Sequence, residues 1–185
     1  MIRLYTERLL IRDHVWIDLP THHALLSDPV AMRYLPDIHT QTLEESKANL
    51  QSAIEQIDAE PRICYFFRIE DKINGEFIGE IGYTVTEFAP QGKCVGLGYF
   101  INKVHWGCGY TTEACKEVLR FAFEEGGVYR VSTGCLAENA ASERVMRKCG
   151  MIKEAEFKEY QLHEGILKDR VEYRLLRSEW AHEGC

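Results

Sequence analysis

The segment YFINKVHWGCGYTTEA, residues 99–114, joins an apolar run to the clearest helix of the chain. Gly107 and Gly109 predict a tight turn, and the pattern that follows predicts a helix over Tyr110–Glu124. A glycine turn that opens a helix presents first-turn backbone amides without intrahelical acceptors, at the positive end of the helix dipole. The segment therefore predicts a strand, a turn able to hold a phosphate, and a helix.

Two well-known phosphate motifs are excluded by the same residues. No Gly-Lys-Ser/Thr follows the turn, so it is not a P-loop, and Thr112 stands where a dinucleotide-binding turn has its third glycine. Taken alone, the two glycines could also serve only to make the turn.

The rest of the chain alternates short β-like runs with helical stripes. Strands are expected over Glu7–Arg12, Cys64–Ile69, Phe77–Val85, Val95–Ile101, Tyr129–Leu136, Glu156–Leu162 and Leu167–Leu176. Further helices are expected from Ile17 to near Pro29, from Thr40 or Thr42 to Pro61, and over Ala140–Lys148. This order indicates one mixed α/β (α+β) domain over residues 1–185, with a mostly antiparallel twisted sheet of about seven strands and about four helices.

Composition narrows the class of protein. The 185 residues are 45% hydrophobic and carry a formal net charge of −7, which fits a soluble globular protein and argues against nucleic-acid binding. The absence of a long apolar run or a leader-like N-terminus predicts no membrane association and no secretion. Seven cysteines without a CxxC pair, Cys185 among them, favour reduced thiols and the cytoplasm. No HExxH or similar spacing occurs, so no metal is expected.

A second informative segment is GCLAENAASERVMRKCGM, residues 134–151. A strand ends at Leu136, and Asn139 begins a short helix, where it could be an N-cap and nothing more. Its place after the glycine turn is what makes it informative.

Together these segments resemble the GNAT superfamily of acetyl-CoA-dependent N-acetyltransferases, in particular its RimJ/RimL-like branch of ribosomal-protein N-acetyltransferases. The resemblance rests on TERLLIR (residues 6–12), WGCGYTTEA (106–114), NAASERVMRKCGM (139–151) and the terminal GILKDRVEYRLLRSEW (165–180). It implies acetyl-CoA as co-substrate, with the pyrophosphate on the amides of residues 107–111. The residues implied to hold acetyl-CoA are Phe100, Ile101, Trp106, Gly107, Cys108, Gly109, Tyr110, Thr111, Asn139 and Ser142.

The chemistry implied by the resemblance is direct attack of a neutral amine on the thioester, without a covalent acetyl-enzyme. Many family members place a tyrosine seven residues after the asparagine as the acid, but Met146 occupies that position here. Cys135 and Ser142 are the candidate replacements, against simpler roles as a small strand residue and a cofactor contact. Glu80, inside the apolar run IGEIGYTV, is the candidate base, unless it faces solvent or an ion partner.

The acceptor class follows from proton energetics. Deprotonating an α-amine at pH 7 costs about 1.4 kcal/mol, whereas deprotonating a lysine amine costs about 4.6 kcal/mol. A site without an obvious base therefore favours a protein N-terminus, such as that of a ribosomal protein. A polyamine, an aminoglycoside, or no acceptor at all, as in a CoA-binding regulator, remain alternatives. The acceptor side is expected near His22, His23, Tyr34, Leu35, Glu164 and Gly165, and a homodimer is compatible with this branch.

Overall fold

A computed structural model describes residues 1–180. Its eight strands form one sheet in the order β1-β2-β3-β4-β5-β6-β8-β7, in which every neighbouring pair is antiparallel except β5 and β6. The strands are β1 (Arg3–Tyr5), β2 (Leu9–Asp13), β3 (Cys64–Asp71), β4 (Phe77–Ala89), β5 (Gly92–Ile101), β6 (Val128–Leu136), β7 (Ile152–His163) and β8 (Ile166–Leu176).

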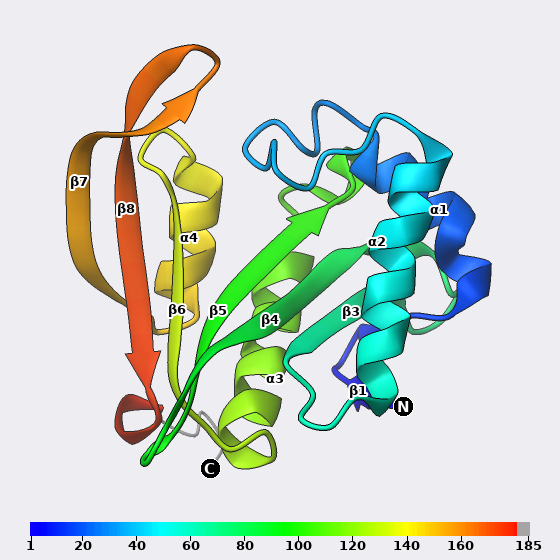
Figure 1. Cartoon of the computed structure of the whole chain (residues 1–185), viewed down its shortest axis with the longest axis horizontal. Coiled ribbons are helices and arrows are strands. Elements are labelled where there is room, and N and C mark those ends of the chain that lie inside the picture. The colour runs from blue at the N-terminus through cyan, green and yellow to red at the C-terminus, as the bar shows by residue number, and fades with distance from the viewer. Residues whose placement is uncertain (181–185) are drawn as a thin grey trace.

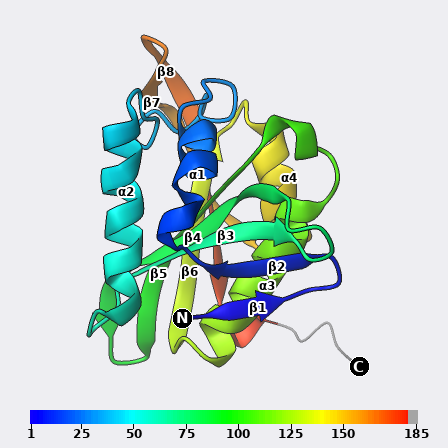
Figure 2. The same ribbon diagram turned by 90° about the vertical axis from the view of Figure 1, so that its right-hand side faces the viewer.

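Four α-helices cover the two faces of this sheet. They are α1 (Leu19–Leu26), α2 (Leu43–Glu55), α3 (Tyr110–Glu124) and α4 (Ala140–Lys148), with single 3-10 turns at η1 (Trp16–Asp18), η2 (Gln56–Asp58), η3 (Lys103–His105) and η4 (Arg177–Glu179). Helices α1 and α2 lie on one face, and α3 and α4 on the other (Figure 2). The main apolar core lies between the sheet and α3, so α3 is fixed firmly behind the strands.

Local sequence explains where the helices begin. Thr42 accepts from the backbone of Glu45, whose carboxylate accepts from the backbone of Thr42, and this capping box starts α2. Helix α3 begins after Gly109 in a left-handed conformation, and Asn139 caps α4 by accepting from the backbone N of Ser142 at 3.2 Å. The predicted bounds of α3 and α4 are confirmed.

The expected first strand, Glu7–Arg12, is wrong in its bounds. The chain instead makes the three-residue strand β1 and then β2, with a turn between them in which the backbone N of Thr6 donates to the carbonyl of Leu9 at 3.0 Å. A strand of three residues is too short to show an alternating pattern, which is why the sheet has eight strands where about seven were expected.

The two parallel strands at the centre of the sheet separate along their length (Figure 1). Their register pairs run from Lys93 with Val128 to Gly96 with Ser132, and no pair follows within the described residues. Residues 97–101 of β5 therefore keep β4 as a neighbour on one side and have no strand on the other.

Six of the seven cysteines are free thiols in the structure, and Cys185 lies outside the described residues. Within residues 1–180, no helix has the length and apolar character needed to cross a membrane.

Candidate active site

A cleft of about 820 Å³ occupies the space where β5 and β6 separate. Its lining comes from the loop between α1 and α2 (residues 30–38), from the ends of β5 and β6, from the glycine turn before α3, and from α4. The cleft thus brings together the two segments that the sequence singled out.

The glycine turn forms one end of the cleft. Gly107 and Gly109 have φ angles of +79° and +82°, which side chains rarely adopt, and both line the cleft. The indole Nε1 of Trp106 donates to the carbonyl of Ile101 at 3.0 Å and so fixes the turn against β5. Thr111 and Thr112, in the first turn of α3, also line the cleft, and the first-turn amides of a helix have no intrahelical acceptors.

An ion pair between Arg8 and Glu113 fixes the glycine turn and the start of α3 to the segment before β2. Glu113, in the first turn of α3, accepts from Thr6 Oγ1 at 2.6 Å, from the backbone N of Arg8 at 2.9 Å and from Arg8 Nε at 2.7 Å. Arg8 also donates to the carbonyl of Cys108 at 3.1 Å. Burial raises the pKa of Glu113, but the bonds from Thr6 and Arg8 outweigh it and lower that pKa below its usual value. Sequence reasoning missed this role of Arg8.

Most of the predicted acetyl-CoA residues line the cleft. Phe100, Ile101, Trp106, Gly107, Gly109, Thr111, Asn139 and Ser142 are in the lining, whereas Cys108 and Tyr110 are not. Cys108 is exposed, and the ring of Tyr110 packs under the guanidinium of Arg8 at 4.4 Å. The edge of β5 that carries Phe100 and Ile101 is the one without a neighbouring strand.

Two hydroxyls and a thiol meet on the α4 side of the cleft. Tyr99 Oη lies 2.9 Å from Ser142 Oγ and 3.2 Å from the Ser142 carbonyl, and Cys135 Sγ lies 3.8 Å from the Asn139 carbonyl. Burial raises the pKa of Tyr99 and also that of Cys135, so both groups keep their protons at neutral pH. Tyr99 was not among the predicted catalytic residues, because a strand tyrosine looks like any other core residue in sequence.

The candidate base Glu80, and Met146 at the usual position of the acid, lie outside this group. Met146 is fully buried in the core. Glu80 is 6% exposed and outside the cleft lining, with His22 Nδ1 at 2.7 Å from its Oε1. On the predicted acceptor side, Tyr34 and Leu35 line the cleft, whereas His22, His23, Glu164 and Gly165 do not.

The charged side chains in the lining are mostly basic. Arg33, Arg144, Lys148 and Arg170 line the cleft, against one acidic residue, Asp37. The cleft is therefore cationic inside a chain whose formal net charge is −7.

Separated parallel strands, with a glycine turn and a helix N-terminus at one end of the gap, are compatible with the acetyl-CoA site that the resemblance implies. The sequence matches the acetyltransferase (GNAT) domain over residues 8–152, and the chain belongs to that family. It is an N-acetyltransferase, and acetyl-CoA is its co-substrate.

One relative by sequence and two solved structures illustrate what the chain is similar to. The chain is similar to an uncharacterized N-acetyltransferase of Bacillus subtilis, YnaD, at 28% identity over 97% of this chain and 99% of the relative. Its fold is similar to that of RimL, a ribosomal L7/L12 α-N-protein acetyltransferase solved with coenzyme A (TM-score 0.84, 18% identity, 95% and 98% covered). It is also similar to the fold of a spermidine N-acetyltransferase of Vibrio cholerae solved with CoA and spermine (TM-score 0.81, 18% identity, 94% and 98% covered).

Proposed function

We propose that this chain acetylates the α-amine of a protein N-terminus, such as that of a ribosomal protein. The observation that carries the proposal is the lack of a strong base in the cleft lining, where Asp37 is the single carboxylate among the described residues. The basic side chains do not decide the acceptor, because Glu164 pairs with Arg33, Glu172 pairs with Arg170, and the phosphates of the coenzyme would share the cleft.

Proton energetics support the same acceptor. An α-amine with a pKa of about 8 is already partly neutral at pH 7, so it needs little help from a base. Asp37 is the one carboxylate in the cleft lining. A lysine side chain or a polyamine, with pKa values near 10, would need a stronger base than the lining offers.

The turn at residues 107–111 is the proposed pyrophosphate site, and the free edge of β5 at Phe100 and Ile101 is the proposed partner of the pantetheine amides. An extended ligand that bonds to an unpaired strand edge acts as an added strand, which fits the gap beside β5. Asn139 and Ser142 would close this arm from the α4 side.

The proposed proton donor of the cleft is the group formed by Tyr99, Ser142 and Cys135. The Tyr99 hydroxyl lies 2.9 Å from Ser142 Oγ. Burial raises its pKa and makes it a weaker acid, so it would donate only to a strong base such as the thiolate as it forms in the cleft. The raised pKa of Cys135 keeps its thiol neutral, which disfavours it as a nucleophile and supports direct transfer without an acetyl-enzyme.

Glu80 stays a prediction as the base. Its carboxylate is buried against His22, so a proton could reach it only through that histidine or through water. An unchanged pH profile of kcat in Glu80→Gln would remove it from the mechanism.

Two alternatives are kept because specific observations favour them. The fold shared with a spermidine N-acetyltransferase favours a small amine, and Met146 at the usual acid position favours a CoA-binding regulator. A regulator would bind acetyl-CoA and transfer nothing. The proposed compartment is the cytoplasm, and a homodimer remains a proposal.

The test compares acceptors by thiol release from acetyl-CoA. One peptide carries a free N-terminus and an internal lysine, and its matched control has the N-terminus blocked and the same lysine free. Of the two peptides, we expect turnover only of the one with the free N-terminus. Its kcat/KM should be at least about tenfold higher than that of spermidine or of an aminoglycoside. Faster turnover of spermidine, or of the blocked peptide, would contradict the proposal, and binding without any turnover would favour the regulator.

A further inference from the structure

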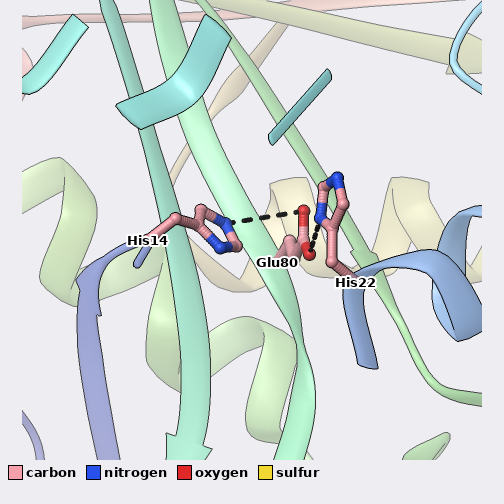
Figure 3. A group of neighbouring side chains, drawn as sticks. All are labelled: His14, His22 and Glu80. Carbon is pink, nitrogen blue, oxygen red and sulfur yellow. Dashed lines mark hydrogen bonds and ion pairs between the residues drawn. The ribbon is translucent and has the colours of Figure 1, made fainter. Parts of the chain in front are cut away.

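Three buried side chains with metal-ligand chemistry meet between the sheet and α1, outside the acetyl-CoA cleft (Figure 3). His14 follows β2, His22 belongs to α1, and Glu80 belongs to β4. Their exposed fractions are 1%, 1% and 6%. The chain thus joins three separate elements at one point that solvent hardly reaches.

The three groups are close enough to share an ion. His22 Nδ1 lies 2.7 Å from Glu80 Oε1, and His14 Nε2 lies 3.7 Å from Glu80 Oε2. One ligand atom from each residue can be chosen so that all lie within 4.8 Å of one another. Zinc bonds of about 2.0–2.1 Å in a tetrahedron place ligand atoms about 3.3 Å apart, so the separations between these ligand atoms would change by about 1.5 Å or less.

The imidazoles have more bonding capacity than the protein around them satisfies. Among residues 1–180, both ring nitrogens of His14 and Nε2 of His22 are buried without a hydrogen bond, and the carboxylate oxygens nearest to His14, at 3.6 Å and 3.7 Å, lie just beyond hydrogen-bond distance. Buried polar atoms in folded proteins nearly always have a partner, and each exception calls for an explanation such as an ion. Figure 3 shows the His14 ring directed at the carboxylate of Glu80.

An outer carboxylate is also in place. Asp18 Oδ2 lies 3.6 Å from His14 Nδ1, and Arg12 holds Asp18 at 2.8 Å. Metal-binding histidines usually direct their second nitrogen at a carboxylate or a carbonyl, which orients the ring. His14 thus has Glu80 on one nitrogen and Asp18 on the other.

The charged side chains near the three ligands cancel one another and leave Glu80, within the residues that the structure describes, without a basic partner from arginine or lysine. Nearby, Arg12 and Arg68 are both paired with Asp18 and with Glu70, so these two positive and two negative charges cancel. The ion pairs of Glu80 in the described part of the chain are with the two histidines alone. Glu80 is therefore a buried carboxylate that no arginine or lysine pairs with among residues 1–180.

A second hollow lies beside His14. It has a volume of about 280 Å³ and is lined by His14 together with Met1, Val15, Trp16 and residues of α2 and η2, none of which lines the acetyl-CoA cleft.

We propose that His14, His22 and Glu80 bind one divalent transition-metal ion of the zinc type. Two imidazoles and a carboxylate are a ligand set that zinc accepts, with a water in the fourth position. The ion would fasten β2 and α1 to β4, beneath the loop that frames the acceptor side of the cleft. This site goes beyond acetyl transfer and does not depend on the acceptor, and a Glu80 carboxylate bound to the ion would not be the base.

The test uses the full chain without a histidine tag, stripped of metal by a chelator and titrated with Zn²⁺ in a calorimeter. We expect one ion per chain. Co²⁺ in place of Zn²⁺ should give the visible bands of a four-coordinate site without the charge-transfer band of thiolate ligands. The Co²⁺ spectrum of the unaltered chain decides the matter even where a variant fails to fold.

Variants identify the ligands. His14→Gln and Glu80→Gln should each weaken Zn²⁺ binding by about 100-fold or more, since losing even an outer-shell partner typically costs 10–100-fold. The matched control is His23→Gln, whose Nδ1 lies 2.8 Å from Ser46 Oγ and which should bind as the unaltered chain does. His14→Gln keeps the Glu80 carboxylate, so it separates metal binding from any role of Glu80 as a base.

Three outcomes would overturn the proposal: no stoichiometric Zn²⁺ binding, a thiolate band in the Co²⁺ spectrum, or unchanged affinity in both ligand variants. None of these readouts uses acetyl transfer, so they are independent of the test of the acceptor.

Discussion

Replacing Tyr99 by phenylalanine removes one oxygen from the acetyl-CoA cleft and keeps the ring in place. That oxygen contacts Ser142 at 2.9 Å and 3.2 Å, so the variant loses about one hydrogen bond. A net hydrogen bond contributes about 0.5–1.5 kcal/mol to folding, which for a chain of this size lowers the Tm by about 3 °C.

A catalytic role predicts a much larger effect on turnover. General acid catalysis typically contributes 10²–10⁴-fold, which corresponds to about 2.7–5.5 kcal/mol of the barrier. If Tyr99 only ties β5 to α4, the loss of about 1 kcal/mol limits the fall in kcat to about fivefold. We expect at least about a 100-fold fall, with the KM for acetyl-CoA within about threefold of the original value.

The assay is thiol release at saturating acetyl-CoA with the peptide concentration varied, between pH 6 and pH 10, so that kcat and kcat/KM for the peptide are both obtained. Because burial raises the pKa of Tyr99, its hydroxyl stays protonated in this range, and kcat/KM for the peptide should rise through the pKa of the amine without an alkaline fall caused by Tyr99. Tyr160→Phe, at an exposed tyrosine of β7, is the matched control. A kcat for Tyr99→Phe within fivefold of the original would refute the role of Tyr99 as the acid.

Three further predictions concern the cleft and its support. Glu113→Gln weakens three hydrogen bonds and should lower the Tm at pH 7 by about 3–6 °C. The native pKa of Glu113 lies below the ordinary value of 4.5, so this stabilisation exists above that pH and should disappear as thermal unfolding is followed into more acidic buffer. Iodoacetamide should label exposed Cys108 at least about tenfold faster than Cys135 at pH 8, as mass spectrometry of the peptides would show, because burial blocks access and raises the pKa of the Cys135 thiol. Gly109→Ala forces a side chain onto a φ of +82° and should cost about 1–2 kcal/mol of stability while raising the KM for acetyl-CoA; an unchanged KM would argue against the turn as the pyrophosphate site.

The sequence predicted most accurately the helices whose ends carry a glycine or a side-chain cap. Helix α3 is bounded by Gly109 and by the glycines at 126 and 127, and α4 begins at the side-chain cap of Asn139, so both were located to the residue. The start of the chain carried no such mark, because β1 is too short for alternation and the Thr6–Arg8 turn contains no glycine.

Parts of the site depend on contacts that no short motif encodes. Arg8 meets Glu113 across 105 residues, and His22 meets Glu80 across 58, so neither pair has a spacing that sequence inspection could recognise. The absence of a metal motif in the sequence therefore says little about His14, His22 and Glu80. Tyr99 was overlooked for a related reason: the face of a strand that borders the cleft is settled only when β5 and β6 separate.

Because β5 and β6 separate, a ligand bound between them would complete the sheet. Register pairing between β5 and β6 covers only residues 93–96 of β5, and the remaining edge has no strand to bond with. A coenzyme bound there as we propose would supply those missing bonds as an added strand, and at 100 times its dissociation constant it would add about 2.7 kcal/mol to the stability of the fold. The lifetime of the protein in a cell would then follow the supply of acetyl-CoA, and the enzyme would be most persistent when its acetyl donor is abundant.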